Sequence, residues 1–299
     1  SLKDVLGDMT LSNLLIEELD LSQINFNGNT LTLQCKQLNK IVGSETFNGS
    51  LLLLPKNCRL TELTLEGISN IEGDFQCKDY FYVKEFVMPF IRVAGNMTIA
   101  LNSGSVDTGA EIEFPKLQEI GGTLTLENNI TFPSLKKILG SCSVTTDFLK
   151  NDIEFTSLES IGTDGANTQI EFKIDVTNIL CPKLKTINGL FNIVTSTVVW
   201  GMTADEVSYP TVESISENLS ITCPYSDFGS NGILSIDFSG LKSVKGISIS
   251  GQGDVSDFSS FKYLFENNVL TGESQWSVRE CAYNPTYQDM KDGKYKPAE

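Results

Sequence analysis

The stretch FPKLQEIGGTLTL, from Phe114 to Leu126, decides the fold because copies of it recur along the chain. Its pattern is aromatic-Pro-x-Leu-x-x-Ile-x-Gly-x-Leu-x-Ile. Clear copies begin at Phe132, Cys181, Tyr209 and Phe238, a broken copy begins at Phe155, and looser copies begin at Cys35, Leu65 and Met88. Repeats of roughly 20–30 residues are typical of solenoids, in which each turn buries its apolar face only against its neighbours. The sequence therefore predicts a mainly β solenoid.

Each copy of the motif also predicts its own local structure. Apolar Leu124 and Leu126 alternate with polar residues, which is the pattern of a strand with one face in the core and one in solvent. The preceding Leu-x-x-Ile spacing suits a tight bend that carries both apolar side chains inward. A positive φ is expected at the glycines between bend and strand, which are Gly95, Gly121, Gly140, Gly189 and Gly246.

The repeat divides the chain into a long central part and two ends. We expect a capping turn at residues 1–34, the repeat solenoid at residues 35–255, and a cap helix with a polar tail at residues 256–299, all in one continuous domain. Phe258, Phe261 and Phe265 recur at helical spacing, so a short helix is predicted to close the core at the C-terminal end. The stretch from Ser277 onward is polar, and we expect it to be extended and weakly ordered.

The net charge of the chain limits the classes of molecule that it is expected to bind. A net charge of −16 argues against a nucleic-acid partner, because phosphate neutralisation needs clustered cations and the arginines Arg59, Arg92 and Arg279 are far apart in sequence. The same charge disfavours binding to anionic membranes and, through self-repulsion, favours a monomer. The sequence has no window of about 20 apolar residues, so no membrane span is expected.

The sequence contains no histidine, and this removes much catalytic chemistry. Ser-His-Asp and Cys-His nucleophile systems and His-ligated zinc sites are excluded. Closely paired cysteines and glycine-rich phosphate loops are missing too, so we expect no enzyme and no cofactor. Carboxylate catalysis stays open, since a glycosidase needs two acids about 5–10 Å apart, such as Glu127 and Glu171. Oxygen ligands for calcium occur at Asp164–Asn167 with Glu171, and at Asp254 with Asp257.

The cysteines follow the repeat rather than a disulfide framework. Five of the seven take positions where the motif places Phe, Leu or Ile, namely Cys35, Cys77, Cys142, Cys181 and Cys223. Buried free cysteine behaves as a small hydrophobe, and an odd total leaves at least one thiol unpaired. We therefore expect reduced core thiols, with one or two disulfide bridges as the alternative.

The candidates for ligand binding are aromatic residues, because exposed aromatic rings stack on the faces of sugars. Trp200 lies in the long insertion VVWGMTADEVSY, and Tyr80 and Tyr82 flank Phe81 in KDYFYVKEF. Three consecutive side chains of an extended segment cannot all point inward, so at least one of these rings is expected to face outward. Packing in the core is the alternative for each of them.

From Cys35 to Ile249 the repeated motif resembles the receptor L-domain family, whose members are relatives of the leucine-rich repeats. This resemblance implies a right-handed parallel β-solenoid and a recognition scaffold that is secreted or on the cell surface. The cysteine-rich modules that flank L domains in growth-factor receptors are missing, which argues against a growth-factor ligand. The tail AYNPTYQDMKDGKYKP, from Ala282 to Pro297, resembles the C-terminal tails of surface lipoproteins of gut Bacteroidetes.

These patterns lead to three hypotheses on function. The first is a non-enzymatic cell-surface recognition or adhesion module that binds a protein or glycan through the solenoid surface. The second is a carbohydrate-active enzyme or glycan-capture protein that uses carboxylates and exposed aromatics. The third is a structural spacer of the cell envelope. The chain starts at Ser1 without an initiator methionine, so we expect a processed end or a cut boundary, with any signal or lipid anchor absent from this chain.

Overall fold

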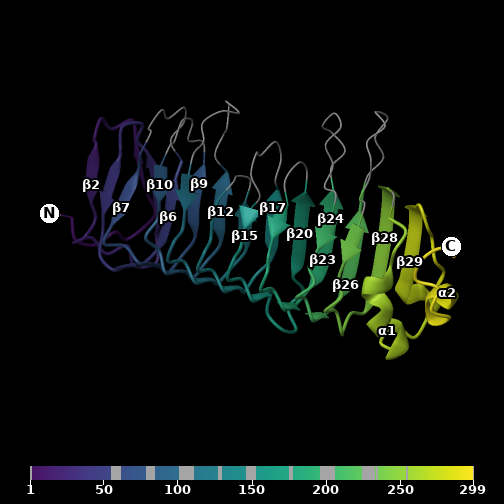
Figure 1. Ribbon diagram of the computed structural model, residues 1–299. Helices are drawn as coiled ribbons and strands as arrows, with labels where there is room; N and C mark the ends of the chain where they lie inside the picture. Colours follow the sequence, from purple (N-terminus) through teal and green to yellow (C-terminus); the bar gives the residue numbers. More distant parts are fainter. Residues whose placement is uncertain are drawn as a thin grey trace. The chain divides into compact units, whose positions relative to one another are not determined.

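A computed structural model describes residues 2–54, 62–78, 85–100, 111–126, 130–145, 153–174, 178–195, 206–223, 233, 235–253 and 255–298. Strands dominate these residues, and they pair in parallel (Figure 1). The prediction of a mainly β, parallel β-solenoid with a short C-terminal helix is confirmed. The chain divides into two compact units: unit 1 is Ser1–Gly140 with Ile153–Thr156, and unit 2 is Ser141–Asp152 with Ser157–Glu299.

Unit 1 is built from rows of short parallel strands that lie one turn apart in sequence. Its long sheet contains β1 (Met9–Ser12), β3 (Thr30–Gln34), β6 (Ser50–Leu53), β9 (Phe75–Lys78), β12 (Met97–Ala100) and β15 (Leu124–Leu126). Its second sheet contains β5 (Thr46–Phe47), β8 (Asn70–Ile71), β11 (Arg92–Val93), β14 (Glu119–Ile120) and β16 (Lys137–Ile138). The other strands are β2 (Glu18–Asp20), β4 (Lys40–Val42) and β7 (Thr64–Glu66), which form a third sheet, the pair β10 (Glu85–Val87) and β13 (Glu111–Glu113), and β18 (Ile153–Glu154).

Every second side chain of the long-sheet strands points into the core of unit 1, as the motif predicts. The inward side chains of β3, β6, β9, β12 and β15 are at most 2% exposed, and they are Leu31, Leu33, Leu51, Leu53, Phe75, Cys77, Met97, Ile99, Leu124 and Leu126. The register stacks them in columns, so that Ile99 lies between Cys77 and Leu126. Burying one such apolar side chain fully is worth about 1.5–3 kcal/mol, and here the burial comes from adjacent turns.

The opening aromatic residues of the motif also stack turn on turn in unit 1. The ring centroids of Phe114 and Phe132 are 5.2 Å apart with an interplanar angle of 14°. Those of Phe132 and Phe155 are 5.4 Å apart with an angle of 4°. All three rings are fully buried, so this column of aromatics runs through the interior.

The first turn of unit 1 pairs like the others, but its core side is open. β1 pairs with β3, and β2 pairs with β4. Met9, Leu11 and Leu19 take inward positions but stay half-buried, and Leu6 and Leu15 are 91% and 83% exposed. Residues 2–25 therefore form a terminal turn of the solenoid, and no other described segment covers it.

Unit 2 repeats the same organisation. Its long sheet contains β17 (Cys142–Thr145), β20 (Gln169–Ile174), β23 (Leu190–Thr195), β26 (Asn218–Thr222), β28 (Gly246–Gly253) and β29 (Trp276–Cys281). Its second sheet contains β19 (Ser160–Ile161), β22 (Thr186–Ile187) and β25 (Ser214–Ile215), and its other strands are β21 (Ile179–Leu180) and the pair β24 (Glu206–Ser208) and β27 (Ser235–Asp237).

The C-terminal end of unit 2 is closed by the predicted helical segment (Figure 1). It consists of η1 (Ser259–Phe261) and α1 (Lys262–Glu266). Phe261 and Phe265 are at most 2% exposed. The ring of Phe261 lies 5.9 Å from that of Phe238 with an angle of 18°, so the cap continues the column of motif aromatics.

The polar tail is ordered, which corrects the prediction of a weakly ordered segment after Ser277. η2 (Glu273–Gln275) leads into β29, the last strand of the long sheet, and α2 (Tyr287–Lys291) follows. Trp276 holds the tail in place, because its ring packs edge-on against Phe265 at 5.1 Å and its Nε1–H donates to the Pro285 carbonyl oxygen at 2.9 Å. The prediction failed because only a few apolar residues hold the tail, and the polar composition of the segment hid them in the sequence.

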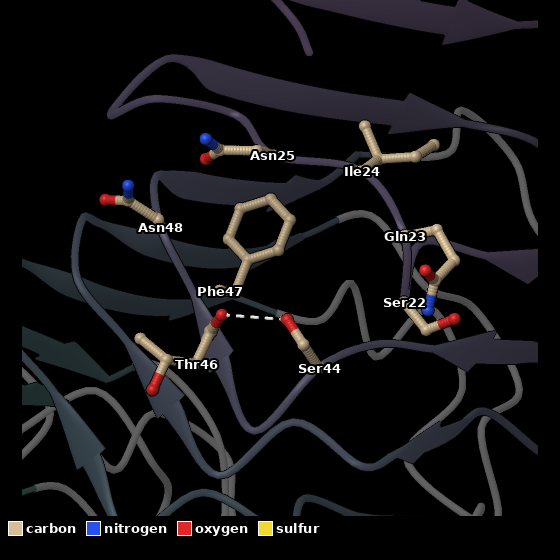
Figure 2. A pocket seen from close by; sticks show the side chains of 8 residues that line it. All are labelled: Ser22, Gln23, Ile24, Asn25, Ser44, Thr46, Phe47 and Asn48. Carbon is tan, nitrogen blue, oxygen red and sulfur yellow. Dashed lines mark hydrogen bonds between the residues drawn. The ribbon is translucent and has the colours of Figure 1, made fainter. Parts of the chain in front are cut away.

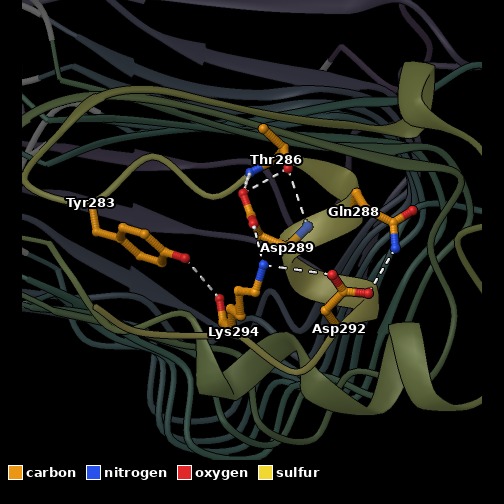
Figure 3. Close-up of polar contacts among 6 residues, drawn as sticks. All are labelled: Tyr283, Thr286, Gln288, Asp289, Asp292 and Lys294. Atoms are coloured by element: carbon orange, nitrogen blue, oxygen red, sulfur yellow. Dashed lines mark hydrogen bonds and ion pairs between the residues drawn. The ribbon is translucent and has the colours of Figure 1, made fainter. Parts of the chain in front are cut away.

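A capping box starts α2, and Figure 3 shows its contacts. The Thr286 hydroxyl accepts the Asp289 N–H at 3.1 Å, and the Asp289 carboxylate accepts the Thr286 N–H at 3.1 Å. Lys294 forms an ion pair with Asp289 at 3.2 Å. The hydrogen bonds from Thr286, followed by Lys294, lower the pKa of the Asp289 carboxyl. On the inner side of α2, Met290 is fully buried.

The motif glycines do not adopt a positive φ, so the prediction of a positive φ between bend and strand was wrong. The glycines with a positive φ are Gly28, Gly67, Gly162, Gly165 and Gly293, and none of the five motif glycines is among them. The role of the motif glycines is close approach, because at Gly95, Gly121, Gly140 and Gly189 an added Cβ would meet atoms of the preceding turn at distances that real Cβ atoms do not show. The sequence cannot separate the two explanations, since both demand a missing side chain.

In unit 1 the close approach forms a continuous column of five glycines, Gly49, Gly73, Gly95, Gly122 and Gly140. From Gly73 onward, each N–H donates to the carbonyl oxygen of the glycine one turn earlier, at 2.9, 3.0, 2.9 and 3.0 Å. Successive backbones are therefore hydrogen-bonded directly, with no space between them for a side chain.

Gly140→Ala is expected to destabilise the fold by about 1–3 kcal/mol, the usual cost of overpacking. The new methyl group would lie 2.5 Å from the backbone carbon of Gly122. The measurement is the midpoint of chemical unfolding. Gly7→Ala is the control, because a Cβ there meets nothing within 4 Å. An unchanged midpoint in Gly140→Ala would contradict the close-approach explanation.

Candidate functional site

The residues predicted to bind a ligand fall outside the described residues. Tyr80 and Tyr82 lie in sequence between β9 and β10, and Trp200 lies between β23 and β24. Their role stays a prediction. Glu127 and Asp254, named for catalysis and for calcium, are also outside the described ranges.

What the structure does place is the outward face of the long sheet. Here "outward row" means the side chains between the two inward positions of each strand, aligned by the register. In unit 1 the outward row is Thr10, Thr32, Leu52, Gln76, Thr98 and Thr125. In unit 2 it is Ser143, Glu171, Asn192, Ser220, Ser248 and Ser277. All of these residues are half-buried or exposed. Strand spacing puts successive members of a row about 4.8 Å apart.

The outward row is almost free of charge. In a chain with 38 acidic residues, the row of unit 1 contains none, and the row of unit 2 contains only Glu171. Glu171 is neutralised by Lys173 on the same strand, with Nζ and Oε2 3.2 Å apart. Arg279 and Glu280 lie near the end of the face, where Glu280 accepts a hydrogen bond from the Ser250 hydroxyl at 3.0 Å. Hydroxyl and amide groups therefore dominate this face.

Carboxylates at the start of the long-sheet strands of unit 1 are committed to the backbone. Asp8 Oδ1 accepts the Thr30 N–H at 2.8 Å. Asp74 Oδ1 accepts the Asn96 N–H at 2.7 Å, and Asn96 Oδ1 accepts the Thr123 N–H at 2.8 Å. These side chains form rungs between neighbouring turns, and they lock the register that aligns the outward row.

Several ion pairs lie elsewhere, on or next to the second sheet and, for Lys40 with Glu66 at 2.9 Å, on the third sheet. In unit 1, Arg92 pairs with Glu72 at 3.3 Å and with Glu119 at 3.2 Å. In unit 2, Lys242 pairs with Glu213 at 3.1 Å. All of these side chains are at least 35% exposed, so each pair contributes at most about 1 kcal/mol. These ion pairs lie off the outward row, in which Glu171 is the one charged side chain.

Two of the acidic residues named as catalytic or calcium candidates have other partners in the structure. Within the described ranges, no three Cys, Asp or Glu side chains come together as metal ligands. Asp257, half of one calcium candidate, accepts the Ser259 N–H at 2.8 Å and so starts the cap helix. Glu171, the described member of the suggested acid pair, is the partner of Lys173.

The cysteines confirm the prediction of core thiols. Cys35, Cys142, Cys181 and Cys223 are buried and free, Cys77 is buried, and Cys281 is free and half-buried. Burial raises the pKa of the Cys142 and Cys181 thiols, which makes them poor nucleophiles. These cysteines fill core positions, as the motif predicts.

Comparisons with protein families, with curated proteins and with solved structures give no significant match. The resemblance to receptor L domains and to Bacteroidetes surface lipoproteins therefore stays a prediction. No helix in the described part of the chain is long and apolar enough to span a membrane.

Sequence reasoning found the outward row only in part. Alternation around Leu124 identified Thr123 and Thr125 as outward positions. Which outward residues from other turns lie beside Thr125 follows from the register, and so does the scarcity of acids in the row. An alignment of the repeats on their inward residues would have revealed both.

Thiol labelling should separate the core cysteines from accessible ones. With iodoacetamide at pH 8, Cys142 and Cys181 should stay unmodified in the native protein and react fully in urea, as peptide mass spectrometry can measure. Cys281 provides the internal comparison, because it is only half-buried. Rapid labelling of Cys142 or Cys181 without denaturant would contradict their placement in the core.

Proposed function

We propose that this protein is a non-enzymatic recognition or adhesion module, at the cell surface or secreted, that binds a protein or glycan through the outward face of the long sheet. The observation that carries the proposal is the scarcity of charge in the outward row, whose one acid, Glu171, is paired with Lys173, on a chain with a net charge of −16. A solvated surface carries charged side chains at little cost in free energy, so a row with so few of them is suited to contact with another molecule.

The chemistry of this row fits a polar, uncharged ligand. Threonine and serine hydroxyls and the amides of Gln76 and Asn192 both donate and accept hydrogen bonds. Most of these side chains are short and stand on a stiff sheet, so binding immobilises few rotamers. Each hydrogen bond is worth only about 0.5–1.5 kcal/mol net, so a useful affinity needs contacts to several strands at once. An extended glycan or a flat protein surface meets that condition.

Two further points support recognition over catalysis. Solenoids provide long regular surfaces, which are commonly used for binding. The resemblance to receptor L domains points to the same class of function, and the resemblance of the tail to surface lipoproteins points to the cell surface. We expect the protein to act as a monomer without a cofactor, and a nucleic-acid partner is disfavoured by its charge.

Placing carboxylates on the outward row should abolish binding. The test is a glycan array, run with and without calcium, for the parent chain, for Thr98→Glu/Ser220→Glu and for Trp200→Ala. Selective binding by the parent should fall at least about 10-fold in the double variant, because unpaired carboxylates would have to be desolvated on contact. Loss in Trp200→Ala would place that residue at the same site.

Asn70→Glu/Ser214→Glu is the matched control, since both residues are half-buried on second sheets. Equal binding by the parent and by Thr98→Glu/Ser220→Glu would refute the outward row as the binding face. A blank array would direct the search to protein ligands, with the same two double variants used in pull-down experiments. Absence of any ligand in both experiments would favour the structural spacer.

A further inference from the structure

A hollow of about 360 Å³ opens between the first two turns of unit 1, away from the long sheet (Figure 2). Its lining comes from two segments, residues 22–25 and residues 44–48, and consists of Ser22, Gln23, Ile24, Asn25, Ser44, Thr46, Phe47 and Asn48. None of these residues was singled out as a ligand contact from the sequence.

The hollow exists because the ladder of the second sheet stops at β5. β5 pairs with β8 on one side and is the edge of its sheet on the other. The segment of the first turn that would continue the ladder bridges elsewhere, through Asn25 to Asp4. The chain rejoins the stack only at Gly28, whose N–H donates to the Asn48 carbonyl oxygen at 2.9 Å. Between these points the edge of β5 is not covered by a neighbouring strand.

The lining is polar and uncharged, and several of its side chains are open to solvent. The side chains of Gln23, Thr46 and Asn48 are exposed, and none of them has a hydrogen-bond partner among the described residues. The Ser44 hydroxyl donates to the Thr46 carbonyl oxygen at 3.0 Å, which keeps the rim of the hollow in shape (Figure 2). Ile24 supplies a half-buried apolar side chain beside these groups.

We propose that this hollow is a second binding site and that it takes a neutral sugar, one or two pyranose units in size. The amides of Gln23 and Asn48 and the hydroxyl of Thr46 can each donate and accept, which matches the hydroxyl groups of a sugar. Ile24 offers an apolar contact for the C–H face of the ring. No charged side chain lines the hollow, so nothing in it would compensate an anionic or cationic ligand. Its volume lies within the usual range for small-ligand sites.

This site is independent of the proposed function, because none of its residues belongs to the long sheet. A sugar held here could be an end group of a longer glycan or a free saccharide. A titration with free monosaccharides and a glycan array distinguish these two sources.

The test is saturation-transfer NMR on the full chain, with neutral hexoses and N-acetylhexosamines as probes and a uronic acid as the anionic comparison. At least one neutral sugar should bind saturably and the uronic acid should not. Gln23→Ala/Asn48→Ala should weaken that binding about 10-fold or more, because two hydrogen-bonding amides are removed. Asn70→Ala is the matched control, because Asn70 lies on β8, the neighbour of β5 on the side away from the hollow.

Three outcomes would overturn this assignment. The first is that no neutral sugar binds the parent chain. The second is unchanged binding in Gln23→Ala/Asn48→Ala, with thermal unfolding showing that the variant is folded. The third is loss of sugar binding in Thr98→Glu/Ser220→Glu but not in the hollow variant, which would move the sugar to the outward row. That last result would leave the proposed function standing.

Discussion

The close approach of successive backbones at the glycine column is the constraint on which the rest of unit 1 depends. Direct N–H to carbonyl hydrogen bonds between Gly73, Gly95 and Gly122 fix both the spacing and the register of the turns. Once the register is fixed, inward side chains must stack on inward ones and outward side chains on outward ones. The buried columns and the outward row are therefore two consequences of one backbone arrangement.

Much of the fold could be predicted from the sequence because each turn repeats the same pattern of inward residues. The inward positions of Leu124 and Leu126 and the helical cap around Phe261 and Phe265 could be predicted for that reason. The role of Gly140 could not, because a missing side chain is equally consistent with a positive φ and with close contact. The order of the tail was also missed, since it depends on Trp276 and a few other buried contacts in a polar segment.

The candidate sites were harder to predict than the fold because they depend on register and on its interruption. Thr98 and Thr125 can each be recognised as outward residues, but only strand pairing brings them side by side. The hollow could not be predicted from the repeat pattern at all. It results from residues 22–25 leaving the ladder of the second sheet, and sequence periodicity does not report where a ladder stops.

The distribution of charge is the observation that stability alone does not explain. A one-layer core uses its inward side chains for packing, so the binding chemistry has to lie on outward positions or in loops. Acidic residues on those positions would keep the protein soluble wherever they stood. Acidic residues lie on other strands, such as Glu119 on the second sheet and Glu18 and Glu66 on the third, while the outward row consists mainly of hydroxyls and amides and has Glu171 as its one acid. Solubility needs no such segregation, whereas contact with an uncharged ligand does, because each buried carboxylate would have to be desolvated.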